Sequence, residues 1–315
     1  MPVALSFDQL LSAKDIQKQD IDLLLNTTDR FHQGMKADAS QFLHLAKGKI
    51  MASLFFEAST RTRFSFEAAM YRLGGEILTL ENGGSSSSIK KGETLSDMGR
   101  IVSGYSDIVV MRHPDSGGVK AFAEYSTVPV INAGDGPMEH PTQSILDLYT
   151  IHYFQKKLEG LSIGFVGDLK FGRTVNSLVQ LLAFFPNQTF YFISHPTLRL
   201  HPEKIQFLKD HGHRVYELDQ FENSISEMDV LYMTRVQEER FSTKEAYNEV
   251  KNHFVLTKES LNKCKPTLSI LHPLPRVNEI MPEVDLHPSA HYFDQATFGV
   301  YVRMAILFHM LEGRA

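Results

Sequence analysis

The sequence predicts an α/β fold with two doubly wound, parallel-sheet domains joined by helices. Short apolar runs of strand character alternate with segments of helical periodicity, and this alternation is typical of parallel sheets. A length of 315 residues fits about two domains. After Gly160 the pattern begins again with a new strand, so we place the change of domain between residues 141 and 160.

The first half is expected to hold four strands with helices between them. Apolar runs predict strands over 48–58, 76–81, 106–114 and 127–136. Helical periodicity predicts helices over 9–35, 62–75 and 140–158, the last with a proline at its start. The segment NGGSSSSIKKGE (82–93) is of low complexity and is expected to be mobile.

The second half repeats the alternation of strands and helices. Residues 161–185 read as strand, tight loop and helix, and further strands are expected over 189–196, 213–219, 228–236 and 266–277. One helix is expected to end near residue 211, another to lie between the strands 213–219 and 228–236, and a last apolar helix to cover 296–313. We expect domains over 1–141 and 142–291, with the segment from about 292 to 315 returning to the first domain.

Composition excludes several classes of protein. The apolar share of 43% and the charged share of 22% are ordinary for a soluble globular chain. Cys264 is the single cysteine, so no disulfide forms within the chain, which suits the cytoplasm. We expect no signal peptide and no membrane span. A net charge of −5 argues against non-specific nucleic-acid binding.

The stretch STRT (59–62) interrupts the apolar pattern between a predicted strand and a predicted helix. A Ser or Thr here caps the helix, whose first N–H groups and dipole favour an anion. Arg61 adds a planar guanidinium that grips phosphate through two hydrogen bonds. The alternative is a polar cap beside a solvated arginine.

Other cations follow strands in both halves. Arg112 and Arg235 each end a predicted strand, Arg173 follows a tight βα turn, and Lys91 lies in the serine-rich segment. His140 and Gln143 begin a helix. Taken alone, each arginine also reads as a solvated charge, the segment with Lys91 as a linker, and His140 as a structural histidine. Ligand sites of α/β proteins, however, gather at such strand ends.

GDLKFGRT (167–174) almost matches the P-loop of nucleotide triphosphatases. Bulky Lys170 and Phe171 disfavour that reading, and the glycine spacing fits a dinucleotide site worse. No histidine or cysteine spacing indicates a metal, and no nucleophile motif is present. We therefore expect a ligand with several negative charges, no cofactor, and catalysis by orientation and electrostatics.

In this order and spacing, STRTR, MRHP, HPTQ, GDLKFGRT, TRVQEERF and HPLPR resemble the catalytic chains of the aspartate carbamoyltransferase family. The resemblance covers essentially the whole chain. It implies transfer of a carbamoyl group from carbamoyl phosphate to L-aspartate, in pyrimidine (UMP) synthesis. The first domain then binds carbamoyl phosphate, the second binds aspartate, and bringing them together desolvates the charges and aligns the substrates.

The resemblance also implies the site residues. Phosphate contacts are expected from Ser59, Thr60, Arg61 and Thr62, and carbamoyl contacts from Arg112, His140 and Gln143. Thr62, Arg112 and His140 are expected to polarise the carbonyl oxygen, while Leu274 and Pro275 offer backbone carbonyls. Arg173, Arg235 and Gln237 are expected to hold the aspartate carboxylates. Ser87, toward carbamoyl phosphate, and Lys91, toward aspartate, are expected to reach a neighbouring subunit's site. The choice of serine among residues 85–88 is left open, whereas the sequence KKGETL anchors Lys91.

That shared site implies a homotrimer. Regulatory or dihydroorotase chains are left open as partners. Two alternatives also stay open. One is a carbamoyltransferase for another amine such as ornithine, which Arg173 and Arg235 disfavour. The other is a non-catalytic homologue, which would need a lost residue in the phosphate site, whereas every motif position that can be checked is filled.

Overall fold

The computed structural model describes residues 4–81, 92–136, 138–221, 224–238, 241, 243–251 and 253–312. The chain forms two compact units. Unit 1 comprises Met1–Leu146 and Thr297–Ala315, and unit 2 comprises Asp147–Ala296.

Unit 1 is built on a parallel four-stranded sheet in the order β2-β1-β3-β4. The strands are β1 (Ile50–Phe55), β2 (Glu76–Glu81), β3 (Ile108–His113) and β4 (Val130–Asp135). Strands β3 and β4 are buried throughout, and β1 is buried except at Ile50, whereas the edge strand β2 is largely exposed. The near-continuous apolar runs are those expected of parallel strands covered on both faces.

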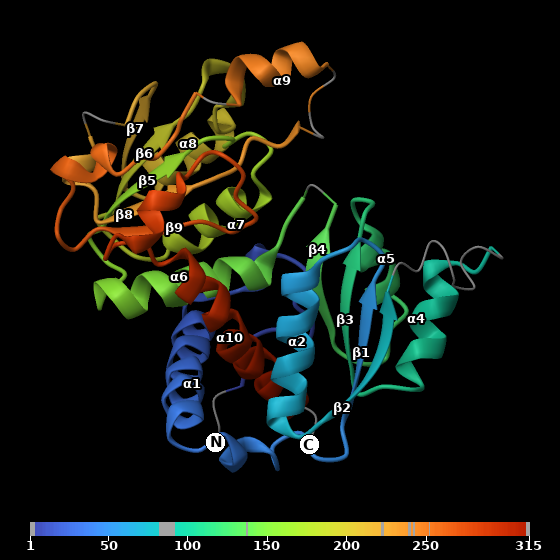
Figure 1. The fold of residues 1–315 in the computed structure, drawn as a ribbon. Coiled ribbons are helices and arrows are strands. Elements are labelled where there is room, and N and C mark those ends of the chain that lie inside the picture. Colours follow the sequence, from blue (N-terminus) through green and yellow to red (C-terminus); the bar gives the residue numbers. More distant parts are fainter. Residues whose placement is uncertain are drawn as a thin grey trace. The chain divides into compact units, whose positions relative to one another are not determined.

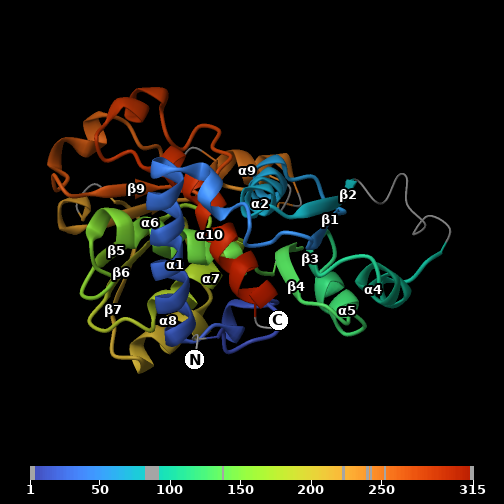
Figure 2. The ribbon, with the colours of Figure 1, turned by 90° about the horizontal axis from the view of Figure 1, so that it is seen from below.

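Helices cover this sheet on two sides. They are α1 (Lys18–Ala37), α2 (Thr60–Leu73), α4 (Leu95–Ser103) and α5 (Gly118–Ala123), with short turns η1 (Ala13–Asp15) and η2 (Ala39–Phe42). Figure 2 shows α2 on one face of the sheet and α4 and α5 on the other. An apolar cluster that includes Val109, Met111 and Phe122 fills the space under α4 and α5.

The last helix, α10 (Tyr292–Glu312), returns to unit 1 from residue 297 onward. It lies beside α1 (Figure 1), where the rings of Phe31 and Phe308 are 5.8 Å apart. Thr27 Oγ1 and His309 Nε2 are 2.7 Å apart in the same contact. The predicted return of the C-terminal helix is therefore confirmed.

Unit 2 is built on a parallel five-stranded sheet in the order β7-β6-β5-β8-β9. The strands are β5 (Ser162–Val166), β6 (Thr189–Ile193), β7 (Arg214–Leu218), β8 (Val230–Met233) and β9 (Ser269–Leu271). The helices are α7 (Arg173–Leu182), α8 (Pro202–Asp210) and α9 (Lys244–Val250), while α6 (Pro141–Gln155) begins in unit 1 and ends in unit 2. The short turns are η4 (Pro196–Leu198), η5 (Ile225–Glu227), η7 (Glu259–Lys263) and η8 (Pro282–Leu286).

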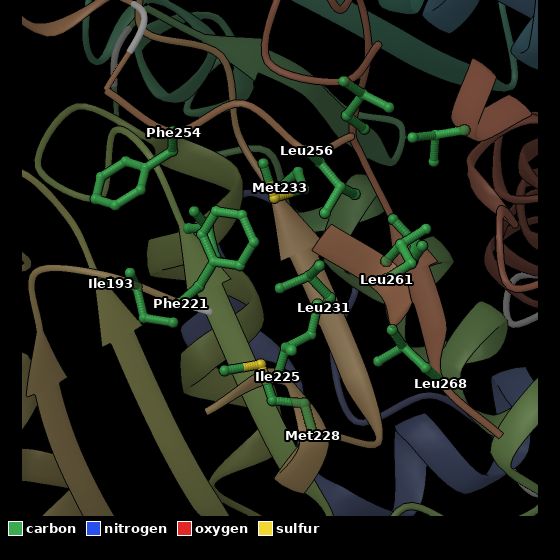
Figure 3. Close-up of a cluster of buried hydrophobic side chains, with 14 of the residues drawn as sticks. Ile193, Phe221, Ile225, Met228, Leu231, Met233, Phe254, Leu256, Leu261 and Leu268 are labelled. Carbon is green, nitrogen blue, oxygen red and sulfur yellow. The ribbon is translucent and has the colours of Figure 1, made fainter. Parts of the chain in front are cut away.

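The two faces of this sheet bury different side chains. Figure 3 shows one face, where Leu231 and Met233 of β8 meet residues of the segments 221–228 and 254–268. Neighbouring residues of a strand point to opposite faces, so Tyr232 lies on the other side. There its ring is 5.5 Å from that of Phe165, and both are fully buried.

The α/β prediction with two parallel sheets is confirmed, and every predicted strand is present. The short helices α4, α5 and α9 were not predicted. The helix expected between β7 and β8 is wrong, because the residues described there form only the 3-10 turn η5. Among the described helices, none combines the length and the apolar character needed to cross a membrane.

Candidate active site

The STRT stretch lies between β1 and α2, at the carboxyl edge of the unit 1 sheet. Ser59 occupies the N-cap position and Thr60 begins the helix, yet within the described residues the Ser59 side chain makes no capping hydrogen bond. Thr62 is buried in the first turn, and Arg61 is exposed. The predicted capping by a hydroxyl is therefore absent from this part of the chain, so that side chain does not satisfy the first N–H groups of α2.

Arg112 is the next-to-last residue of β3, beside the end of β1 in the sheet. Its partner in the β1 register is Phe55, and the residue is 8% exposed. Arg112 Nη2 lies 2.7 Å from Glu57 Oε2, whereas its Nε atom has no hydrogen-bond partner among the described residues. The guanidinium also lies against β4, because a Cβ added to Gly134 would be 3.0 Å from Arg112 Nη1. A glycine is needed there for this close approach.

The charges of Arg61 and Arg112 oppose each other. Partial burial lowers the pKa of Arg61, and repulsion from Arg112 lowers it further. Burial likewise lowers the pKa of Arg112, although attraction to Glu57 acts in the opposite direction. One carboxylate therefore only partly compensates two guanidinium groups, and a bound anion would be stabilised there.

His140 and Gln143 come from the start of α6, which follows β4. His140 is 4% exposed and Gln143 is 9% exposed. The Gln143 N–H donates to the His140 carbonyl at 3.0 Å, and His140 Nδ1 is 3.3 Å from Thr142 Oγ1. Since β1, β3 and β4 are parallel, Arg61, Arg112 and His140 all lie at or after strand ends on the same edge of one sheet.

In unit 2, the predicted residues follow β5 and β8, which are neighbours in the sheet. Arg173 is the first residue of α7, and Arg235 comes two residues after β8. Gln237 Nε2 donates to the Phe171 carbonyl at 3.2 Å, which joins the two βα loops. Thr234 Oγ1 donates to the Val166 carbonyl at 2.9 Å and fixes the backbone beside Arg235.

The HPLPR loop (272–276) follows β9 at the same edge of the unit 2 sheet. The Leu274–Pro275 peptide is cis, and Leu274 has a φ of 54°, in the left-handed region that non-glycine residues seldom adopt. The Leu274 N–H donates to His272 Nδ1 at 2.7 Å, so the other ring nitrogen of His272 carries the proton. That nitrogen donates to Glu279 Oε1 at 2.7 Å.

Arg276 ends the loop in a two-pronged ion pair with Asp285, and Arg276 also donates to Tyr292. The hydrogen bond from Arg276 lowers the pKa of Asp285, against the effect of burial. The backbone carbonyls of Leu274 and Pro275 thus belong to a loop that side chains hold at both ends.

The structure places the predicted phosphate and carbamoyl side chains in unit 1, and Arg173, Arg235, Gln237, Leu274 and Pro275 in unit 2. Ser87 and Lys91 lie outside the described residues. Glu57 was missed, although it stands two residues before Ser59 and its charge was a usable signal. Across the described parts of the chain, no group of three or more His, Cys, Asp or Glu side chains is arranged to hold a metal ion.

Comparison with known proteins identifies the family. Residues 8–153 match the model of the aspartate/ornithine carbamoyltransferase carbamoyl-P binding domain, and residues 159–310 match that of the Asp/Orn binding domain. The aspartate carbamoyltransferase catalytic subunit of Thermococcus kodakarensis is 48% identical over 298 residues, which are 95% of each chain. That of Methanocaldococcus jannaschii is 46% identical over 303 residues, covering 96% of this chain and 97% of the relative.

Solved structures agree with these matches. The catalytic subunit of M. jannaschii aspartate transcarbamoylase has a TM-score of 0.91 at 45% identity, covering 98% of this chain and 99% of its own. Aspartate transcarbamoylase from Trypanosoma cruzi, solved with carbamoyl phosphate and aspartate, has a TM-score of 0.91 at 35% identity, covering 98% of both chains. The chain therefore belongs to the aspartate/ornithine carbamoyltransferase family, among the aspartate carbamoyltransferase catalytic subunits.

Proposed function

We propose that this chain transfers the carbamoyl group of carbamoyl phosphate to the amine of L-aspartate, giving N-carbamoyl-L-aspartate and phosphate. The observation that carries the proposal is the under-compensated pair Arg61 and Arg112 at the edge of the unit 1 sheet. The names of the relatives, and the T. cruzi enzyme solved with both substrates, support the same reaction. We place the reaction in pyrimidine (UMP) synthesis.

The phosphate end of the substrate binds at the start of α2. Backbone N–H groups of the first helical turn and the hydroxyls of Ser59, Thr60 and Thr62 donate to the phosphate oxygens. Arg61 adds a charge-assisted, two-pronged contact. Since repulsion from Arg112 opposes the charge on Arg61, binding a dianion relieves an unfavourable interaction that exists in the empty site.

Thr62, Arg112 and His140 donate to the carbamoyl oxygen, and Gln143 contacts the carbamoyl nitrogen. Attack on the carbamoyl carbon places negative charge on that oxygen in a tetrahedral intermediate. Donors already held in position stabilise this charge in the transition state, and one such donor contributes about 10²–10³ in rate. The burial of Arg112 strengthens its contribution, because charges interact more strongly away from water.

L-Aspartate binds through Arg173, Arg235 and Gln237 of unit 2. Two guanidinium groups match two carboxylates, whereas the side chain of ornithine carries a positive charge that they repel. The carbonyls of Leu274 and Pro275 accept hydrogen bonds from the attacking amine and the carbamoyl nitrogen. The loop that carries them is held by His272 and Arg276, so these acceptors are preorganised.

The chemistry needs no protein nucleophile. The amine nitrogen of aspartate forms a bond to the carbamoyl carbon, and the bond from that carbon to the phosphate oxygen then breaks. The amine gives up its proton, and the departing phosphate is the nearest base that the substrates themselves supply. The protein contributes orientation and charge stabilisation, and the residues proposed here supply both.

We further propose a homotrimer in which Ser87 and Lys91 act in a neighbouring subunit's site. Phe64 and Tyr71 are 54% and 57% exposed and lie two turns apart on one face of α2. Leu78 of the edge strand β2 is 47% exposed. A second copy of the chain that covered these side chains would remove apolar surface from water.

The trans arrangement is testable by mixing inactive subunits. A Lys91→Ala chain and an Arg112→Ala chain are each expected to be inactive alone. Reassembled together they are expected to regain activity, because some sites then receive an intact Lys91 from one subunit and an intact Arg112 from the other. No recovery in a reassembled trimer would contradict sites shared between subunits. We also propose a cytoplasmic location, and we leave regulatory or dihydroorotase chains open as partners.

The reaction itself is tested by offering carbamoyl phosphate with L-aspartate and with L-ornithine separately. We expect carbamoylated product with L-aspartate alone. Product with L-ornithine alone would support carbamoyl phosphate binding in unit 1, but it would contradict the binding of aspartate carboxylates by Arg173 and Arg235. A folded, assembled chain that makes neither product would overturn the proposed reaction.

A further inference from the structure

A chain of buried hydrogen bonds runs through unit 2 and centres on Asp147. Tyr232 Oη donates to Asp147 Oδ2 at 2.7 Å, and Gln295 Nε2 donates to Asp147 Oδ1 at 2.7 Å. The backbone N–H of His272 donates to Gln295 Oε1 at 2.9 Å. Asp147 and Tyr232 are fully buried, and Gln295 and His272 are each 1% exposed. At the other end, the hydroxyl of Thr174 hydrogen-bonds the Tyr232 oxygen.

The backbone N–H of His272 fixes the direction of the hydrogen bonds through Gln295. A backbone N–H can only donate, so Gln295 turns its oxygen to His272 and its NH₂ group to Asp147. Asp147 must therefore accept on that side. Its other oxygen accepts from the Tyr232 hydroxyl. Donors therefore converge on Asp147 from both ends of this hydrogen-bond network.

This hydrogen-bond network joins the elements that carry the proposed aspartate contacts. Thr174 follows Arg173 at the start of α7, and Tyr232 stands three residues before Arg235 on β8. His272 begins the loop that presents the carbonyls of Leu274 and Pro275, and its ring receives the Leu274 N–H. Both arginines and the carbonyl loop are therefore tied to one buried carboxylate.

We propose that Asp147 is a positioning residue for the L-aspartate half of the site, a role that rests on the proposed function. It fixes Arg173, Arg235 and the 272–275 loop relative to one another through Tyr232 and Gln295, without touching substrate itself. Misplacement of a reacting group by about 1 Å can cost roughly 10²-fold in rate. Two donors or two acceptors facing each other in this hydrogen-bond network are therefore expected to lower kcat/KM for L-aspartate and to leave phosphate binding to unit 1 unchanged.

The test exchanges the amide and the carboxylate. Asp147→Asn alone sets the new NH₂ group against one of two donors, the NH₂ of Gln295 or the hydroxyl of Tyr232. Gln295→Glu alone sets two carboxylates against each other. The double variant D147N/Q295E matches again: Glu at 295 accepts from His272 and from the Asn side chain, which still accepts from Tyr232. Kinetics with L-aspartate, inorganic phosphate affinity and thermal unfolding are measured for all four proteins.

We expect each single variant to lower kcat/KM for L-aspartate by roughly tenfold or more, and the double variant to recover to within about threefold of the unsubstituted chain. Inorganic phosphate affinity should stay within about twofold throughout. Folded single variants with normal kcat/KM would overturn the proposal, and so would a folded double variant that shows no recovery.

A milder pair of variants covers the case in which a single variant does not fold. Tyr232→Phe removes one donor to Asp147 and keeps the ring. Tyr191→Phe is the matched control, since Tyr191 Oη donates to Glu227 Oε2 at 2.6 Å from β6 of the same sheet. We expect only Tyr232→Phe to lower kcat/KM for L-aspartate, and equal kinetics in the two variants would overturn the proposal. An unsubstituted chain inactive with L-aspartate would overturn the proposed function first, and the positioning role with it.

Discussion

Replacing Arg112 by alanine is expected to lower kcat strongly while changing the free energy of unfolding little. The guanidinium is 8% exposed, and its Nη2 is 2.7 Å from Glu57. If it donates to the carbamoyl oxygen, its loss should lower kcat by about 10²–10³, or about 2.7–4 kcal/mol of transition-state stabilisation. The Glu57 side chain is 41% exposed, so its carboxylate returns to water when its partner is removed. We therefore expect the broken ion pair to cost less than about 1 kcal/mol of unfolding free energy.

Two further variants sharpen this prediction. Arg112→Lys keeps the charge but loses the planar fork, so it should retain part of the phosphate affinity and still lose roughly tenfold or more in kcat. Arg199→Ala removes an exposed arginine that pairs with Asp219 at 3.0 Å, and its kinetics should be unchanged. The assay is initial-rate formation of N-carbamoyl-L-aspartate, with thermal unfolding measured in parallel. A folded Arg112→Ala protein whose kcat stays within about threefold of the parent would refute the assigned role.

Three other predictions concern unit 2. Arg235→Met should raise the KM for L-aspartate with little change in phosphate affinity, and steady-state kinetics that show an unchanged KM would contradict the carboxylate assignment. Gly167→Ala should destabilise the fold by about 1–3 kcal/mol in urea unfolding, because φ is +111° and the added Cβ would lie 2.5 Å from the Thr234 carbonyl oxygen; an unchanged midpoint would argue against this. Burial acts to raise the pKa of Glu279, but hydrogen bonds from His272 and the backbone lower it below the ordinary 4.5. Its carboxylate therefore stabilises the fold above pH 4.5, and this stabilisation is lost as pH falls through the lowered pKa, so urea midpoints should decline less steeply on acidification in Glu279→Gln than in the parent.

Sequence reasoning predicted the cations of each unit together because one rule applies to every parallel sheet. All strands of such a sheet end at the same edge, so Arg61 and Arg112 could be grouped from their places at or after predicted strand ends, without knowing the strand order. The pairing of Arg112 with Glu57 was not predictable in this way. It depends on β1 and β3 being neighbours, which only the fold determines.

The Asp147 chain was beyond sequence reasoning for a similar reason. Asp147 and Gln295 are 148 residues apart. Asp147 stands in a helical pattern and Gln295 just before one, where a polar residue reads as solvent-exposed. Their burial follows from tertiary packing, which overrides local pattern. The short helices α4, α5 and α9 were not predicted, because segments of six to nine residues contain too few turns to show helical periodicity.

The two units treat buried charge in opposite ways, and the difference follows from their proposed tasks. In unit 1 the charge on two guanidinium groups is only partly compensated, and Arg112 Nε has no hydrogen-bond partner within the described chain. Such an arrangement costs stability until an anion arrives, so its favourable interactions are kept for the substrate and the transition state. In unit 2 the donors between Thr174 and His272 converge on Asp147, which stabilises one geometry whether or not a ligand is bound. Substitutions near Arg112 should therefore change the chemical step, whereas substitutions around Asp147 should change how well L-aspartate is placed for it.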